Sequence, residues 1–150
     1  MTVNVPRSHL HVGQKIVVNK SFPFGDVRQF AALTHDTNPL HLNETYAKAT
    51  RFGERIVHGV LVLGFVSGVI GTRMPGIGTV VISHDVTYPA PTHIDDTVSC
   101  EVVVTEIGRG RRVKVHVTCV SLEQNHTVLE GDFLLVVTRE ALESSYQCKS

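Results

Sequence analysis

An aspartate and a histidine stand five residues apart in segment 36–41, which reads DTNPLH. Pro39 interrupts helical spacing between them, so a rigid turn must aim both side chains, and a turn at the end of a helix can point them into one cleft. Asp36 accepts hydrogen bonds and a neutral His41 both donates and accepts them, so together they can hold one water and move its protons near neutral pH. A second interpretation stays open on these residues alone: Asp36 and Asn38 cap the helix end, and His41 is a satisfied turn residue.

A candidate binding group for a carbonyl oxygen lies in segment 56–59, IVHG, which leads into a long apolar run. The start of a helix presents unpaired N–H groups and a partial positive charge. If this helix end opens on the same cleft, the Gly59 N–H can bind a carbonyl that becomes an enolate-like oxyanion, and glycine lets a substrate approach closely. Ser67, two turns further along, hydrogen-bonds either the site or its own helix carbonyl, and the sequence leaves both open.

Three helices are expected to position these groups. Segment 26–33 places apolar residues on one face and must stop before Pro39, because the residue before a proline is pushed out of the α region. Segment 44–50 predicts a second short helix, and segment 59–71 is apolar all round, which indicates a helix surrounded by protein. Three glycines form one stripe on this last helix: Gly64, Gly68 and Gly71. We expect the sheet to approach the helix closely along that stripe, the alternative being a loosely tolerated glycine-rich helix.

The second half of the chain is predicted to be β. Between residues 79 and 138 apolar and polar residues alternate with period two, as they do around Val115. Segments 108–111 and 123–126 are typical of hairpin connections between long strands. We therefore expect one α+β domain, residues 1–150, in which an antiparallel sheet wraps around one central hydrophobic helix.

Composition excludes several classes of function. The 150 residues suffice for one domain with a single core, and 14 basic side chains balance 14 acidic ones, so no net charge draws the protein to nucleic acid or an anionic membrane. Charged residues make up 19% and hydrophobic residues 42%, which excludes a disordered charged tail. The run 57–70 is too short to span a bilayer, and the first seven residues lack the apolar stretch of a secretory signal, so we expect a soluble protein.

Cysteine usage indicates a reducing compartment. Cys100, Cys119 and Cys148 form an odd set without CxxC spacing. We expect reduced, buried thiols in an intracellular protein rather than a disulfide scaffold or a zinc knuckle.

Segments 36–41 and 56–59, with Phe52 between them and Ser67 after them, resemble the signature of the MaoC-like hot-dog proteins. These proteins are (R)-specific enoyl-thioester hydratases and 3-hydroxyacyl-thioester dehydratases. The resemblance is closest to the type 2 dehydratase of mitochondrial fatty-acid synthesis, and the bacterial single-domain hydratases are similar too. It continues through further segments, 71–76 and 88–91 (YPAP), and covers roughly residues 10–138.

The resemblance implies a hot-dog fold with a defined site. By this resemblance Asp36 and His41 are expected to be the catalytic pair, and the Gly59 N–H is expected to hold the substrate carbonyl. Supporting roles are expected for three more residues: Asn38, Ser67 and His58.

The activity that this resemblance implies is the reversible hydration of trans-2-enoyl thioesters to (3R)-hydroxyacyl thioesters of coenzyme A or acyl carrier protein. We expect no cofactor, no metal, no nucleic acid and no membrane partner. We also expect a homodimer, because the exposed edges of such a sheet usually pair. The compartment is expected to be the mitochondrial matrix if the chain is eukaryotic and the cytoplasm if it is bacterial. Two alternatives stay open: a hot-dog acyl thioesterase, which attacks C1, and a non-catalytic protein that binds acyl thioesters or associates with RNA.

Three weaker signals each carry an alternative. His9 and His11 are either metal ligands or the solvent face of a strand. The arginine-rich segment 108–112 either contacts RNA or forms a solvated hairpin. Either the arginines of this segment, or Arg51 and Arg55 beside the signature, are candidates to meet the phosphates of coenzyme A or acyl carrier protein.

Overall fold

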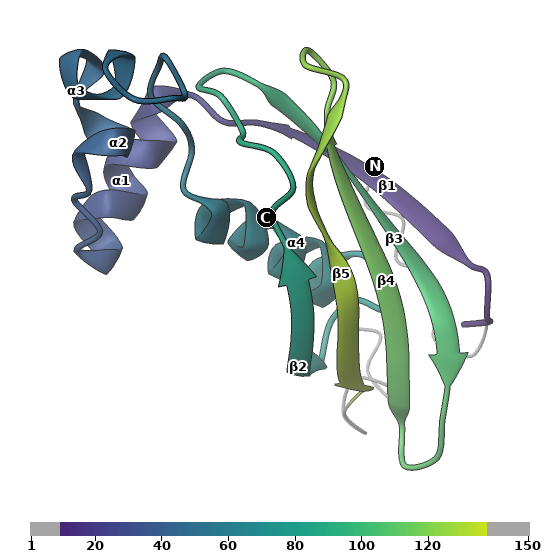
Figure 1. Ribbon diagram of the computed structural model, residues 1–150. Helices are drawn as coiled ribbons and strands as arrows, with labels where there is room; N and C mark the ends of the chain where they lie inside the picture. Colours follow the sequence, from purple (N-terminus) through teal and green to yellow (C-terminus); the bar gives the residue numbers. More distant parts are fainter. Residues whose placement is uncertain (1–9, 138–150) are drawn as a thin grey trace.

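The computed structural model describes residues 10–137, which form one curved antiparallel sheet and four helices (Figure 1). The sheet has the strand order β1-β3-β4-β5-β2, so β1 and β2 are its edges. In chain order the elements are β1 (Lys15–Ser21), α1 (Phe24–Thr34), α2 (Pro39–Leu42), α3 (Glu44–Lys48), α4 (Gly59–Thr72), β2 (Thr79–Thr87), β3 (Thr97–Ile107), β4 (Arg112–Ser121) and β5 (His126–Val137). Figure 1 shows α4 against the concave face of the sheet, with α1, α2 and α3 gathered to one side. The expected α+β hot-dog arrangement is confirmed.

Alternating valines of the central strands build the core. Every second residue is buried along β4 and along β3 as far as Val104, and the pairing sets Val102 opposite Val117 and Val104 opposite Val115. The buried residues of α4 join the same cluster. Both predicted hairpin turns are present, whereas the sequence pattern did not single out the edge strand β1, which pairs with β3.

Within one chain, only one face of α4 is covered. Val62, Val66 and Val69 are buried against the sheet, whereas Val60 is 59% exposed. A Cβ placed on each glycine of the predicted stripe would meet nothing outside its own helix within 4 Å: Gly64, Gly68 and Gly71. The expectation that protein surrounds α4, with the sheet pressed on these glycines, is therefore wrong for the single chain, because the sheet covers the opposite face.

The turn before α2 also differs in part from expectation. α1 ends just before His35, which takes a left-handed conformation with φ 63°. Pro39 then occupies the first turn of α2, where no N–H is needed, and the Asn38 side-chain oxygen accepts the N–H two residues on at 3.0 Å. Pro39 does lie beyond the end of α1, but it also starts a one-turn helix, and His41 lies in that helix rather than in an irregular turn.

Expectations about isolated residues have mixed outcomes. His11 is exposed and lies ahead of β1, so the predicted strand with two histidines on one face is wrong for His11, while His9 is outside the described residues. Cys100 and Cys119 face each other across β3 and β4 as buried free thiols, as expected, and Cys148 is outside the described residues. Between residues 10 and 137 no helix is long and apolar enough to cross a membrane.

Candidate active site

Three titratable side chains from separate segments converge at the start of α4. Asp36 lies in the loop after α1, His41 lies in α2, and His58 is the N-cap of α4. One polar atom of each side chain lies within 4.8 Å of the others. The structure thus brings the predicted pair together and places His58 beside it.

His41 is held in one orientation by the backbone. The residue is 9% exposed, and its Nδ1 lies 2.7 Å from the carbonyl oxygen of Ile56. Because a carbonyl oxygen only accepts, Nδ1 carries the proton and donates it, which leaves the lone pair on Nε2. In its neutral form His41 therefore presents Nε2 as the nitrogen that can take a proton from water.

His58 is buried against the pair and is only 2% exposed. Its Nε2 donates to the backbone carbonyl of Asp36 at 3.1 Å, and its ring stacks on His41 with centroids 3.8 Å apart. Burial lowers the pKa of His58 below its ordinary value, against the opposing effect of this hydrogen bond. The Asp36 carboxylate lies 3.8 Å from Nε2, too far for a hydrogen bond. His58 is therefore a neutral donor that anchors the backbone of Asp36, and not half of an ion pair.

The carboxylate of Asp36 has two tasks. Its Oδ1 accepts the N–H of Asn38 at 3.3 Å and so orders the turn. Its Oδ2 lies toward His58, and half of the side chain is exposed. The helix-end interpretation and the catalytic interpretation are thus compatible, because Oδ1 orders the turn while Oδ2 makes no hydrogen bond to a described residue.

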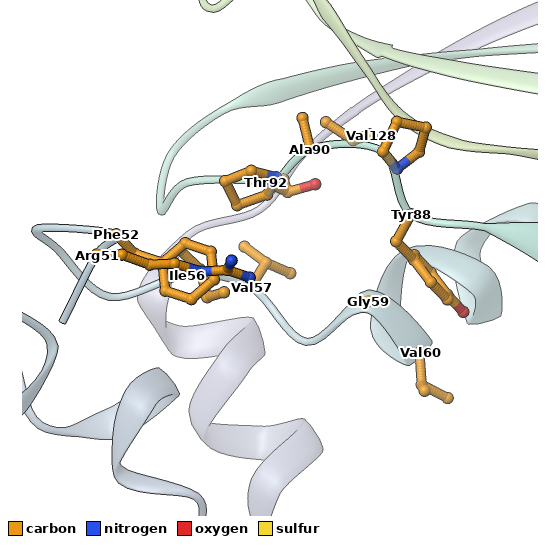
Figure 2. Close-up of a pocket in the computed structure, with 12 residues that line it drawn as sticks. Arg51, Phe52, Ile56, Val57, Gly59, Val60, Tyr88, Ala90, Thr92 and Val128 are labelled. Atoms are coloured by element: carbon orange, nitrogen blue, oxygen red, sulfur yellow. The ribbon is translucent and has the colours of Figure 1, made fainter.

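The N-terminus of α4 presents its first N–H group at the same place. Gly59 opens the helix, so its N–H has no acceptor within α4. A Cβ on Gly59 would lie 2.9 Å from Cε1 of Tyr88, so the tyrosine ring rests against the glycine backbone (Figure 2). Tyr88 was not among the predicted site residues. The signal for it was segment 88–91 (YPAP), through which the family resemblance continues.

A pocket with a volume of about 380 Å³ adjoins Gly59 (Figure 2). Its walls come from two segments, 51–60 and 88–92, together with Val128 of β5. Asp36 and His41 do not line it. The pocket and the Asp36–His41 pair are therefore neighbouring compartments that share the N-terminus of α4.

The two remaining predicted supporting residues lie in different places. Asn38 caps α2 and thereby fixes the turn between Asp36 and His41. Ser67 lies eight residues beyond Gly59, roughly 12 Å along the helix, on the exposed face of α4. A single chain does not bring Ser67 to the pair.

The same three side chains are the one group of potential metal ligands in the described part of the chain. Each histidine already donates one ring N–H to a backbone carbonyl, so each ring offers at most its other nitrogen. The arrangement suits acid–base chemistry on a water, with Nε2 of His41 and the Asp36 carboxylate as acceptors and the Gly59 N–H as donor to a nearby oxyanion.

Known proteins share this sequence and fold. A family described as "MaoC like domain" matches residues 9–125. The chain is 39% identical over 131 residues to a 3-hydroxybutyryl-CoA dehydratase of Methylorubrum extorquens, covering 87% of this chain and 83% of the relative. It is 39% identical over 126 residues to an (R)-specific enoyl-CoA hydratase of Rhodospirillum rubrum, covering 83% of this chain and 86% of the relative. The solved (R)-hydratase of Aeromonas caviae superposes with a TM-score of 0.82 at 30% identity, covering 87% of this chain and 98% of that one. This chain therefore belongs to the MaoC-like dehydratase family of hot-dog proteins.

Proposed function

We propose that this protein is a hydro-lyase that reversibly adds water to trans-2-enoyl thioesters and forms (3R)-hydroxyacyl thioesters. Relatives named as a hydratase and a dehydratase of CoA thioesters, each matched over more than four fifths of its length, support this activity. One observation carries the assignment to residues. The Nδ1–H of His41 is committed to the Ile56 carbonyl, which leaves Nε2 as a base beside Asp36.

In the hydration direction Asp36 and His41 hold the water that attacks C3. As the C3–O bond forms, the pair takes one proton from the water and the C2=C3 π electrons move toward the thioester carbonyl. The pair returns one proton to C2, so it ends as it began. The Gly59 N–H stabilises the negative charge on the carbonyl oxygen. General acid–base catalysis typically contributes about 10²–10⁴-fold, and positioning and the oxyanion contact add to that.

Two residues support the pair without touching the reacting atoms. His58 fixes the Asp36 carbonyl and packs against the His41 ring, so it positions both members. Asn38 caps α2 and so sets the distance along the turn between them. We assign Ser67 to the surface around the site rather than to the pair, because it lies on the uncovered face of α4.

We also propose a homodimer. The edge strand β2 exposes Val80 (49%) and Ile82 (56%), and the helix α4, which contacts β2, leaves Val60 uncovered. An exposed apolar edge of this kind is normally paired or covered. A second copy of the chain fits it, because a two-fold axis perpendicular to β2 sets two copies of this strand antiparallel, edge to edge. The glycines of α4 then allow close approach of the second helix, and Ser67 lies in the interface.

Light scattering at micromolar concentration measures the oligomeric state directly. We expect twice the mass of the chain for the natural sequence. Ile82→Lys places a charge on the edge of β2 and is expected to give a folded monomer. A natural protein that stays monomeric contradicts the dimer.

For the carrier and compartment we infer a substrate on coenzyme A or acyl carrier protein within a reducing compartment. This compartment is the mitochondrial matrix in a eukaryote or the cytoplasm in a bacterium. The buried free thiols of Cys100 and Cys119, opposite each other and unlinked, support a reducing environment.

The test of the activity is the hydration of crotonyl-CoA across a series with longer acyl chains, with chiral analysis of the product. We expect loss of the enoyl absorbance and a (3R)-hydroxyacyl product. Release of free coenzyme A thiol would instead identify a thioesterase. Binding without a change of absorbance would identify a non-catalytic acyl-thioester-binding protein.

A further inference from the structure

The two arginines near the site have different surroundings, and Arg55 is already neutralised. Its Nε lies 2.8 Å from Oε2 of Glu44, an ion-pair distance although the N–H is not aligned for a hydrogen bond. Its guanidinium also lies 3.8 Å from the centroid of the Phe24 ring. Arg55 does not line the pocket, so its charge serves the packing of helices beside the site.

Arg51 is exposed and available. It forms no ion pair with any described residue, and its guanidinium lies over the neighbouring Phe52 ring at 4.8 Å from the centroid. Arg51 lines the pocket, and Figure 2 shows its guanidinium extended along the pocket wall toward Val57. In the part of the chain that the structure describes, it is the one basic side chain of the pocket lining.

The geometry of a thioester determines which end of it points to this pocket. When the carbonyl oxygen binds the Gly59 N–H, the carbonyl carbon has two other substituents, C2 and sulfur. C3 must reach Asp36 and His41, so C2 points toward the pair and the sulfur points away from it. The pocket also begins at Gly59 but excludes the pair, so it lies where the sulfur and its attached arm must leave.

The lining of the pocket matches such an arm. Apart from Arg51, its walls are apolar or uncharged and include the Tyr88 ring, Ala90 and Thr92. An uncharged, flexible chain of amide and methylene groups suits these walls, and an anion at the end of that chain suits an unpaired guanidinium.

On the basis of the proposed thioester chemistry, we propose that this pocket holds the pantetheine arm of the acyl carrier and that Arg51 binds a carrier phosphate at the pocket rim. Two carriers share this chemistry. The phosphate directly on the pantetheine arm occurs in both coenzyme A and acyl carrier protein, whereas the remaining phosphates belong to coenzyme A alone. Arg51 is therefore a residue of carrier recognition and not a catalytic residue.

The test compares the natural enzyme and Arg51→Gln on three crotonyl thioesters: that of coenzyme A, that of 4′-phosphopantetheine and that of pantetheine without phosphate. We expect KM for the coenzyme A ester to rise about 5–30-fold with kcat unchanged, because the lost contact is the same in ground and transition states. KM for the pantetheine ester should not change. An equal rise for all three esters, or no rise for any, would overturn the role of Arg51.

The phosphopantetheine ester identifies which phosphate is bound. A rise equal to that for coenzyme A assigns Arg51 to the phosphate on the arm, which both carriers present. No rise with this ester, together with a rise for coenzyme A, assigns it to the nucleotide phosphates. Both results support phosphate recognition by Arg51.

A second variant tests the pocket itself. Ala90→Phe narrows the pocket without changing charge, so it should raise KM for all three esters, pantetheine included. An Ala90→Phe enzyme with natural KM for all three would show that the arm leaves elsewhere. The melting temperature of each variant checks that the fold is intact.

Arg109→Gln is the matched control, because it removes the same charge from the hairpin between β3 and β4, outside the pocket. It should leave all three KM values unchanged. This result would show that Arg51 acts by direct contact with the phosphate, and not by long-range electrostatic attraction of the substrate.

The pantetheine ester also separates this proposal from the proposed activity. If the natural enzyme hydrates no ester, the activity is wrong, whereas hydration with no difference between Arg51→Gln and the natural enzyme overturns the carrier site alone.

Discussion

On the inner face of the sheet, buried side chains pack on one another, whereas at the start of α4 the side chains of the site are held by backbone carbonyls. On β3 and β4, Val102 and Val117 occupy facing positions that alternation along each strand already selects. His41 and His58, by contrast, bond to carbonyls of residues 15 and 22 positions away in sequence. The sheet therefore depends on a local repeat, and the site depends on how separate segments meet.

Two histidines show the same contrast in electrostatic form. His58 is buried in the site, and burial lowers its pKa. His116 lies on the outer face of the sheet, where hydrogen bonding to Asp132, aided by Glu130, raises its pKa. The two residues contribute to stability in opposite pH ranges, so they allow the two regions to be tested separately.

The largest expected effect is on the catalytic pair. Asp36→Asn keeps the oxygen that orders the turn but removes the charge that holds the water, so hydration of crotonyl-CoA should fall by about 10²–10⁴-fold at nearly natural melting temperature. His41→Ala should lose activity similarly, and the double variant should be about as poor as the worse single one, because the pair acts as a unit. A steady-state assay and a melting curve for each variant provide the measurement.

His41→Ala has a further cost that the sequence did not predict. It leaves the Ile56 carbonyl without its donor, so we expect a loss of about 1–3 kcal/mol in the free energy of unfolding. Glu106→Gln, at an exposed carboxylate near the end of β3, is the control and should change neither activity nor stability appreciably. Near-natural turnover by Asp36→Asn would contradict the mechanism.

The next effect concerns stability and belongs to the sheet. Leu135 of β5 is fully buried, so Leu135→Ala should lower the free energy of unfolding by about 2–5 kcal/mol through lost burial and the cavity it leaves. Urea unfolding measures the change. The kcat of the fraction that remains folded should stay close to natural, because the carbonyls that hold His41 and His58 lie outside the sheet. A Leu135→Ala enzyme that is stable but inactive would show that the sheet core and the site do not contribute separately to stability and activity.

The same division separates the features that the sequence predicted from those it did not. Alternation indicated the strands β2 to β5, and the DTNPLH and IVHG segments located the pair and the helix end, since each signal lies within one short stretch. Alternation could not show which face of α4 the sheet leaves open, because that helix is apolar on all sides. No local pattern encodes where distant loops meet. The sequence therefore could not show that Tyr88 contacts Gly59, or that Arg55 pairs with Glu44 while Arg51 does not.

His58 offers an intermediate test, because it supports the pair only through position. His58→Ala removes the donor to the Asp36 carbonyl and should lower kcat about 10–100-fold by misplacing the pair. His58→Gln retains an N–H donor and should restore much of the loss, which a purely space-filling role does not predict. Unchanged kcat in His58→Ala would exclude the positioning role.

The pH dependence of stability adds a second readout for His58. Its pKa is lowered on folding, so the unfolded chain binds the proton first as the pH falls below the ordinary value of about 6.5. The stability of the natural protein should therefore fall in that range, and His58→Gln should remove part of the slope. Urea unfolding at several pH values measures both slopes.

The smallest effect belongs to the outer face of the sheet and has the opposite sign. The pKa of His116 is raised by its carboxylate neighbours, so its stabilising charge is fully present below about pH 6.5 and is lost as the pH rises through the folded-state pKa. His116→Gln should therefore be less stable than the natural protein near pH 5.5 and equal to it at alkaline pH. Since a third of the side chain is exposed, solvent screening limits the difference to at most about 1 kcal/mol. Molar salt should reduce this difference in stability further, because the Debye length then falls to about 3 Å.

The activity of His116→Gln should not change, because Asp132 and Glu130 lie on β5 and contact neither Asp36 nor His41. If kcat of His116→Gln fell together with its stability at acid pH, the outer surface of the sheet would be coupled to the site. The two regions would then not be independent.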